Sequence, residues 1–143
     1  MAIHPTASIQ DSTVETEHVR EFVTVHDSTI EADSRLYERV SVKKSVVGPH
    51  VDINAGSYIE NAAIESHVQI GPNASVVGVT HRLSEASGME HRNDQFEEIV
   101  LETGAFVGAG AVVLPGVTVG TNAVIGANVT VTDDVPEGVV IRG

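Results

Sequence analysis

The chain has 143 residues, which is enough for one domain and too few for two sizeable cores. It contains no cysteine, so a disulfide framework, a thiolate metal site and a cysteine nucleophile are excluded. Its formal net charge of −12 repels phosphate backbones, and nucleic acid is therefore not an expected partner.

The N-terminal stretch MAIHPTASIQ has neither a basic segment nor a hydrophobic run, and no segment approaches ~18 apolar residues. The sequence thus predicts a cytoplasmic protein with no membrane partner. Lys43 and Lys44 are the only lysines, beside 20 acidic residues, and this balance is typical of proteins from a high-salt cytoplasm. An ordinary acidic protein is the alternative.

Aliphatic residues recur at a regular spacing through the first half of the chain. From residue 30 the steps are six, six and five, so the pattern closes every 17 residues. The aliphatic positions are Ile30, Leu36, Val42, Val47, Ile53, Ile59, Ile64, Ile70 and Val76, after a looser start at Ile3, Ile9, Val14, Val19 and Val25. Small or aliphatic residues stand four positions later, at Ser34, Val40, Val51, Ser57, Val68 and Ala74.

The second half keeps a strict step of six. Its aliphatic positions are Leu101, Val107, Val113, Val119, Ile125 and Val131, and its small positions are Ala105, Ala111, Val117, Ala123 and Val129. Glycine often follows the aliphatic, at Gly108, Gly120 and Gly126. We expect these glycines to relieve backbone strain at a turn.

A period of six matches neither a helix nor a simple strand. Three hexads per coil predict a triangular solenoid, in which the aliphatic points inward and the small residue fits a tight corner. The whole chain, residues 1–143, then forms one all-β domain of about seven coils stacked at the spacing of β-strands. A β-sandwich predicts a period of two, and it does not explain the recurring step of five.

Residues 79–99 interrupt this pattern with polar and charged side chains, among them His81 and His91. Loops that interrupt a rigid scaffold often carry function. We therefore expect one external excursion loop at residues 79–99, and we expect it to carry a functional histidine.

The hexads follow the pattern [LIV]-G-x-x-[STAV]-x, and the chain also contains VQIGPNASVVGVTHRLS and AVIGANVTVTDDVPEGVVIRG. From Ile53 to Val140 it resembles the hexapeptide-repeat acetyltransferases, and most closely the maltose/galactoside and xenobiotic O-acetyltransferases. The resemblance implies a single-stranded left-handed parallel β-helix. The left hand comes from the resemblance alone, because parallel crossovers are otherwise right-handed.

The resemblance also implies a homotrimer that binds acetyl-CoA in the cleft between neighbouring prisms. Members of the family that the chain resembles transfer the acetyl group to a hydroxyl of a sugar or a similar small acceptor. His81 stands at the position of the family's catalytic histidine, after Thr80, and an imidazole near neutral pH suits a general base. A surface loop histidine is the alternative for His81, and we expect His91 to be solvated or a lid contact.

Two residues resemble acceptor-binding positions of the family. Asn54 matches an asparagine that contacts the acceptor hydroxyl, although an asparagine also stacks in a corner ladder. Glu60 falls near the family's acceptor-contacting acid.

Four residues match cofactor-binding positions. Phe106 replaces the family's tryptophan and is expected either to pack against the acetyl or pantetheine arm or to lie at a subunit contact. Ala109 and Ala127 match positions whose backbone binds the pantetheine arm, although a tight corner also requires small residues. Thr132 completes this expected acetyl-CoA site.

Two departures from the family reduce positive charge at the expected CoA site. Asp133 stands where the family often has lysine, and the sequence ends at Arg142-Gly143, where relatives continue into a basic tail. A non-catalytic β-helix trimer is therefore an alternative function, and an amino-sugar N-acetyltransferase is another.

His50 and His67 are 17 residues apart and share a phase with Asp33. We expect the three to stack on one outer face, either as a solvated polar ladder or as a divalent metal site. The γ-class carbonic anhydrases share the expected architecture and bind zinc at trimer interfaces. Their ligands include two histidines five residues apart, which this sequence lacks, so no metal is expected.

Overall fold

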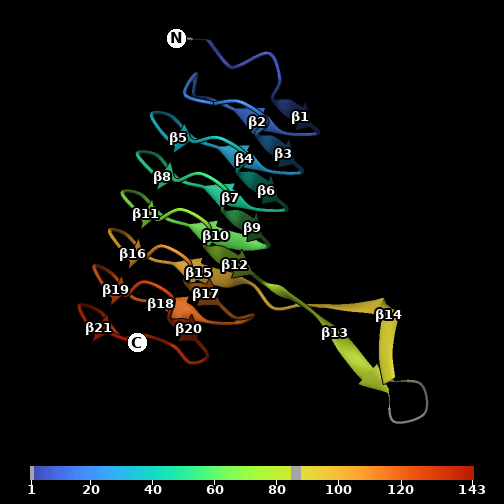
Figure 1. Cartoon of the computed structure of the whole chain (residues 1–143), viewed down its shortest axis with the longest axis vertical. Coiled ribbons are helices and arrows are strands. Elements are labelled where there is room, and N and C mark those ends of the chain that lie inside the picture. The colour runs from blue at the N-terminus through green and yellow to red at the C-terminus, as the bar shows by residue number, and fades with distance from the viewer. Residues whose placement is uncertain (1, 85–87) are drawn as a thin grey trace.

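A computed structural model describes residues 2–84 and 88–143, except the side chains of residues 82–93. Short strands form three parallel sheets, and the chain visits each sheet once per coil (Figure 1). Seven described strands of one sheet correspond to the predicted seven coils. Among the described residues there is no helix of the length and hydropathy needed to cross a membrane.

The three sheets are named here as faces of the prism. Face A contains β1 (Ser8–Gln10), β3 (Thr24–His26), β6 (Ser41–Lys43), β9 (Tyr58–Glu60), β12 (Ser75–Val77), β17 (Val112–Val113) and β20 (Thr130–Val131). Face B contains β2 (Thr13–Val14), β4 (Thr29–Ile30), β7 (Val46–Val47), β10 (Ala62–Ile64), β15 (Ile99–Leu101) and β18 (Thr118–Val119). Face C contains β5 (Arg35–Leu36), β8 (Asp52–Ile53), β11 (Gln69–Ile70), β16 (Phe106–Val107), β19 (Val124–Ile125) and β21 (Val140–Ile141).

The core is a stack of aliphatic side chains inside the prism. Each aliphatic position predicted from residue 30 to residue 131 is buried, and so is each small position four residues later. On face A the register places Val42 against Ile59, Ile59 against Val76, and Val76 against Val113. Like residues therefore pack on like residues from coil to coil, and their removal from water stabilises the stack.

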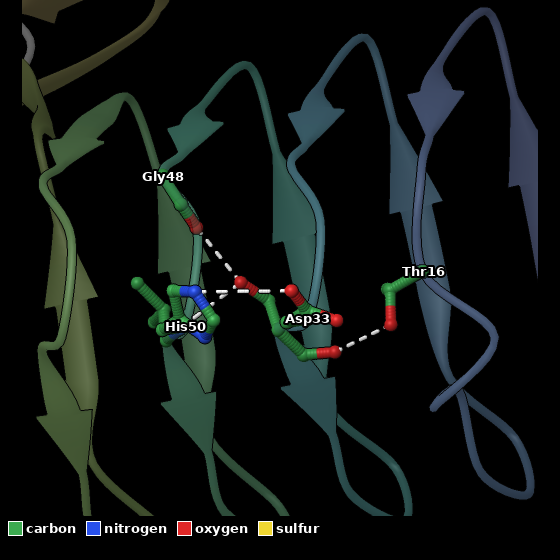
Figure 2. Close-up of polar contacts among 6 residues, drawn as sticks. Thr16, Asp33, Gly48 and His50 are labelled. Atoms are coloured by element: carbon green, nitrogen blue, oxygen red, sulfur yellow. Dashed lines mark hydrogen bonds and ion pairs between the residues drawn. The ribbon is translucent and has the colours of Figure 1, made fainter.

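Serine at a small position also joins neighbouring coils by hydrogen bonds. The Ser34 hydroxyl accepts from the Val51 amide at 3.0 Å and donates to the Gly48 carbonyl at 2.7 Å. The Thr16 hydroxyl donates to the Ser34 carbonyl at 2.7 Å, and both Thr16 and Gly48 are labelled in Figure 2. Because these buried polar groups are all paired, they do not destabilise the interior.

The glycines that follow an aliphatic residue do not serve the purpose predicted from the sequence. Gly108 does not have a positive φ, so an unusual backbone angle does not explain why glycine occurs there. A Cβ atom at Gly108 would instead lie 2.7 Å from the Ala127 amide nitrogen in the next coil, and one at Gly71 would lie 2.6 Å from that of Ala109. These glycines permit close approach between coils.

The excursion leaves the prism at the corner between faces A and B, which we call corner AB. It consists of β13 (Val79–Ser84) and β14 (Gly88–Phe96), which pair antiparallel with a register shift between His81 and Arg82. The expected loop is therefore a two-stranded arm, residues 79–96, and it projects sideways from the stack in Figure 1. The chain returns to the prism at β15.

The base of the arm is fixed to the coils on both sides of it. The Gly78 amide donates to the Glu60 carbonyl at 2.8 Å, and the Glu97 amide donates to the Gly78 carbonyl at 2.9 Å. The Asn61 side-chain amide donates to the same Gly78 carbonyl at 2.8 Å, and Gly116 donates to the Glu97 carbonyl at 2.9 Å. The arm is thus anchored to a rigid scaffold.

Replacing Gly78 with alanine is expected to loosen the arm. The added Cβ would lie 2.4 Å from the Asn61 carbonyl oxygen and 2.9 Å from that of Glu97, so the backbone must shift. Overpacking of this kind costs about 1–3 kcal/mol. We expect faster trypsin cleavage within the arm. Gly143→Ala is the control, because a Cβ there would meet only Val129 Cγ2, at an ordinary contact distance of 3.7 Å; equal acceleration in both variants would contradict the anchor.

Candidate active site

The arm carries a paired histidine and aspartate. His81 in β13 and Asp94 in β14 are register partners, and His81 Nδ1 lies 2.9 Å from Asp94 Oδ1. The two side chains are 46% and 43% exposed, so solvent and a substrate can reach both. The arrangement assigns the Nδ1 proton to the bond with Asp94 and leaves a lone pair on Nε2.

This pair has the geometry of an oriented general base. The carboxylate fixes the imidazole ring and its tautomer, and it leaves Nε2 as the atom that takes a proton. Sequence reasoning named His81 as a candidate base but did not name Asp94, which is 13 residues away. Only the antiparallel pairing of the two arm strands brings them together, and the pattern of the sequence does not state that pairing.

Glu60 lies directly beside the base of the arm. It ends β9 on face A, one coil before Val77, and its carbonyl accepts the Gly78 amide. The Tyr58 hydroxyl donates to Glu60 Oε1 at 2.5 Å. The carboxylate is therefore held at corner AB, on the same corner as the arm.

The hydroxyl of Tyr58 is a weaker acid than usual. Burial, and then the hydrogen bond and the negative charge of Glu60, raise the pKa of Tyr58 from 10.0 to about 12. The folded state therefore holds this proton more tightly than the unfolded chain does. Tyr58 contributes stability that is fully present below pH 10 and is lost as the pH rises towards 12.

Tyr58→Phe is expected to remove the tyrosinate absorbance step near pH 12 and to reduce the alkaline loss of stability above pH 10. It also frees the Glu60 carboxylate. An absorbance titration of both proteins measures the first effect, and thermal unfolding at several alkaline pH values measures the second. Tyr37→Phe is the control. Survival of the step near pH 12 in Tyr58→Phe would contradict the assignment.

Thr132 also lies at corner AB. It follows β20 directly and donates from its hydroxyl to Asp133 Oδ2 at 3.2 Å. Glu60, His81 and Thr132 therefore share one corner. Glu60 lies one coil before the coil from which the arm leaves, His81 lies on the arm, and Thr132 lies two coils after it.

The other predicted residues lie at the corner between faces C and A, corner CA, or on face C. The Asn54 side-chain amide donates to the Ile70 carbonyl in the next coil at 2.8 Å. This contact agrees with the alternative that Asn54 stacks in a corner ladder between coils. Ala109 and Ala127 are exposed in successive coils at corner CA. Phe106 is 42% exposed on face C, paired with Gln69 and Val124. One chain therefore does not bring all the predicted residues together.

The histidine column forms, but at a corner and not on an outer face. His50 and His67 have φ angles of 57° and 62°, which place them at the turn between faces B and C. Their rings stack with centroids 5.0 Å apart and an interplanar angle of 21°. His50 Nε2 lies 3.7 Å from Asp33 Oδ2 (Figure 2). Stacked rings present their faces to each other, and a metal needs converging ring nitrogens.

Within residues 2–84 and 88–143, searched as far as their side chains are described, no group of three or more histidine or acidic side chains is placed to hold a metal. The side chain of His91 lies outside the described residues.

Two family models match the chain. Residues 3–94 match the model described as GlmU-like, C-terminal hexapeptide, and residues 98–133 match the bacterial transferase hexapeptide model (six repeats). The galactoside O-acetyltransferase of Lactococcus lactis subsp. lactis is 40% identical over 81 residues, covering 56% of this chain and 38% of the relative. The bifunctional protein GlmU of a Geobacillus species is 34% identical over 110 residues, covering 77% and 21%. The chain thus spans well under half of these relatives.

Solved structures share the architecture. A hexapeptide-repeat acetyltransferase from Vibrio cholerae, complexed with acetyl coenzyme A, has a TM-score of 0.71 at 25% identity, covering 82% of this chain and 66% of that one. A galactoside acetyltransferase in complex with coenzyme A has a TM-score of 0.73 at 24% identity, covering 82% and 61%.

A coil of the opposite hand would not superpose in this way, so the predicted left-handed parallel β-helix is confirmed. The chain belongs to the GlmU-like, C-terminal hexapeptide family.

Proposed function

We propose that this protein is an acetyltransferase that moves an acetyl group from acetyl-CoA to a hydroxyl of a sugar or a similar small acceptor. The observation that carries the proposal is the His81–Asp94 contact of 2.9 Å on an arm anchored to a hexapeptide solenoid. The galactoside O-acetyltransferase relative and the acetyl coenzyme A complex of a similar structure support it.

The reaction needs one proton to move twice. His81 Nε2 takes the proton of the acceptor hydroxyl as its oxygen attacks the thioester carbon. The tetrahedral intermediate then expels the CoA sulfur, and the imidazolium returns the proton to that sulfur. Asp94 stabilises the imidazolium between these steps, and a base positioned in this way contributes about 10²–10⁴-fold. No acyl-enzyme forms, in keeping with a chain without cysteine.

The complete site lies between copies of the chain in a homotrimer. His81, Glu60 and Thr132 lie at corner AB, and Asn54, Ala109 and Ala127 lie at corner CA. In a cyclic trimer different surfaces of two copies meet at each interface. Corner AB of one copy facing corner CA and Phe106 of the next would unite the acceptor residues Asn54 and Glu60 with the donor residues.

The test is release of the CoA thiol in the presence of matched acceptors. Purified protein is given acetyl-CoA with hexoses or amino sugars, at low and at molar KCl because the composition predicts a high-salt cytoplasm. Hydroxyl acetylation, seen by mass spectrometry of the product, supports the proposal. Acetylation of amines alone would make the protein an N-acetyltransferase. No binding of acetyl-CoA at either salt concentration would favour a non-catalytic trimer, which the acidic Asp133 suggests.

A further inference from the structure

The two lysines of this acidic chain are adjacent, and both lie two coils before the arm. Lys43 ends β6 on face A and Lys44 follows it at corner AB, two coils before the arm leaves. No other lysine occurs in the sequence, whose formal net charge is −12. Positive charge on flexible ammonium groups is therefore concentrated in one region of the surface.

Lys44 contacts the arm itself. Its Nζ atom lies 4.8 Å from the ring centroid of Phe96, which ends β14 and pairs with Val79. Phe96 is two residues from Asp94, or about 7 Å along a strand. The ammonium group thus stands on the order of 10 Å from the His81–Asp94 pair by the same strand geometry.

Lys43 lies beside Glu60, which is one of the two residues proposed to bind the acceptor. Its Nζ atom is 5.5 Å from the ring centroid of Tyr58, whose hydroxyl holds Glu60. Aromatic rings orient both ammonium groups without removing their charge, because a cation over a ring face remains a full cation. Both lysines therefore offer oriented positive charge to a ligand.

The position of Lys44 carries a conformational cost. Its φ of 50° is in the left-handed region, where most other corners of this chain use Asp, Asn or Gly. Arg39 gives a comparison, because it has a φ of 61° and lies over the Phe22 ring at 5.3 Å, at corner CA. Arg39 shares the local geometry of Lys44 but lies at a different corner from the arm.

We propose that Lys44, supported by the charge of Lys43, binds an anionic group of the acceptor. The substrate class is then a sugar, or a hydroxyl compound of similar size, that carries a phosphate or a carboxylate within about 10 Å of the hydroxyl that is acetylated. The proposal rests on the proposed function. It assigns the anion to the acceptor because both lysines lie on coils before the arm with Asn54 and Glu60.

The proposed donor residues Phe106, Ala109, Ala127 and Thr132 all lie on coils after the arm. This separation is the reason that the phosphates of acetyl-CoA are not assigned to Lys44. The test must nevertheless distinguish the two sources of the anion.

The binding test uses the fact that only two lysines exist. Protein labelled with carbon-13 at lysine Cε gives two side-chain signals, which Lys44→Gln assigns. Glucose 6-phosphate is expected to shift the Lys44 signal saturably, and glucose is not. Equal, unsaturated shifts of both signals with glucose 6-phosphate would overturn the proposal, whether or not the protein shows transferase activity.

The kinetic test compares glucose with glucose 6-phosphate and glucuronic acid. Lys44→Gln is expected to raise KM for the charged acceptors about tenfold or more. Loss of one hydrogen bond to a charged group typically weakens binding by about this factor. KM for acetyl-CoA should not change, Lys44→Arg should restore charged-acceptor binding, and Arg39→Gln should have no effect.

Two results would overturn the proposal here. A rise in KM for acetyl-CoA alone would assign the cation to the donor, and identical losses in Lys44→Gln and Arg39→Gln would make the ring contact merely structural. Absence of transfer with every acceptor would instead contradict the proposed function. The carbon-13 binding experiment with glucose 6-phosphate would still decide the role of Lys44.

Discussion

His81→Ala is expected to lower kcat/KM for acetyl transfer by about 10²–10⁴-fold, because it removes the base that takes the acceptor proton. The side chain is 46% exposed and belongs to the projecting arm, so the aliphatic core is unchanged. Thiol release from acetyl-CoA measures the rate, and calorimetry measures whether acetyl-CoA still binds. The expected outcome is a lost rate with retained binding.

Asp94→Asn separates the role of the carboxylate from that of the ring. An amide at this position keeps a similar shape but loses the charge that favours the imidazolium, so we expect a smaller loss than for His81→Ala. Asp52→Asn is the matched control, because it removes the same charge from face C, where Asp52 accepts a hydrogen bond from Gln69. Full activity in His81→Ala would end the proposed mechanism.

The coils could be predicted from spacing alone because the same physical demand recurs in every hexad. An inward position such as Ile59 must be apolar in each coil, and a small position such as Ser57 must fit the corner beside it. Both are buried as predicted. A repeated constraint leaves a repeated signal, and many copies of a weak signal outweigh the exceptions.

The arm could be located but not described, because it occurs once. The hexad pattern stops at Gly78, where the polar residues of the arm begin, and this break predicted the position of the arm. Its two strands pair with a register shift beside His81, so the partner of the histidine could not be counted from the sequence. Asp94 therefore emerged only from the structure.

Corner residues show a second limit of the spacing argument. The phase of His50 and His67 correctly predicted that they stack, since residues 17 apart occupy equivalent positions. It did not reveal that the position is a left-handed turn, where Asn, Asp and His are the enriched non-glycine residues. Phase fixes which residues are neighbours, and backbone conformation fixes where they point.

Ile59→Ala is expected to destabilise the protein by about 2–5 kcal/mol, the usual cost of this truncation in a well-packed core. Ile59 is fully buried and packs between Val42 and Val76 in the coils on either side. A solenoid holds each coil chiefly through its neighbours, so a cavity at one level weakens the junction between the two halves. Urea denaturation followed by circular dichroism measures the change.

The position of this cavity also links stability to activity. The coil of Ile59 contains Glu60 and Asn61, whose backbone and side chain hold Gly78 at the base of the arm. Transfer activity should therefore fall at lower urea than the circular dichroism signal does. Val46→Ala is the control, because Val46 is 52% exposed on face B and its truncation should cost within about 0.5 kcal/mol. Equal destabilisation by both variants would mean that the outer faces, and not the stacked interior, hold the coils together.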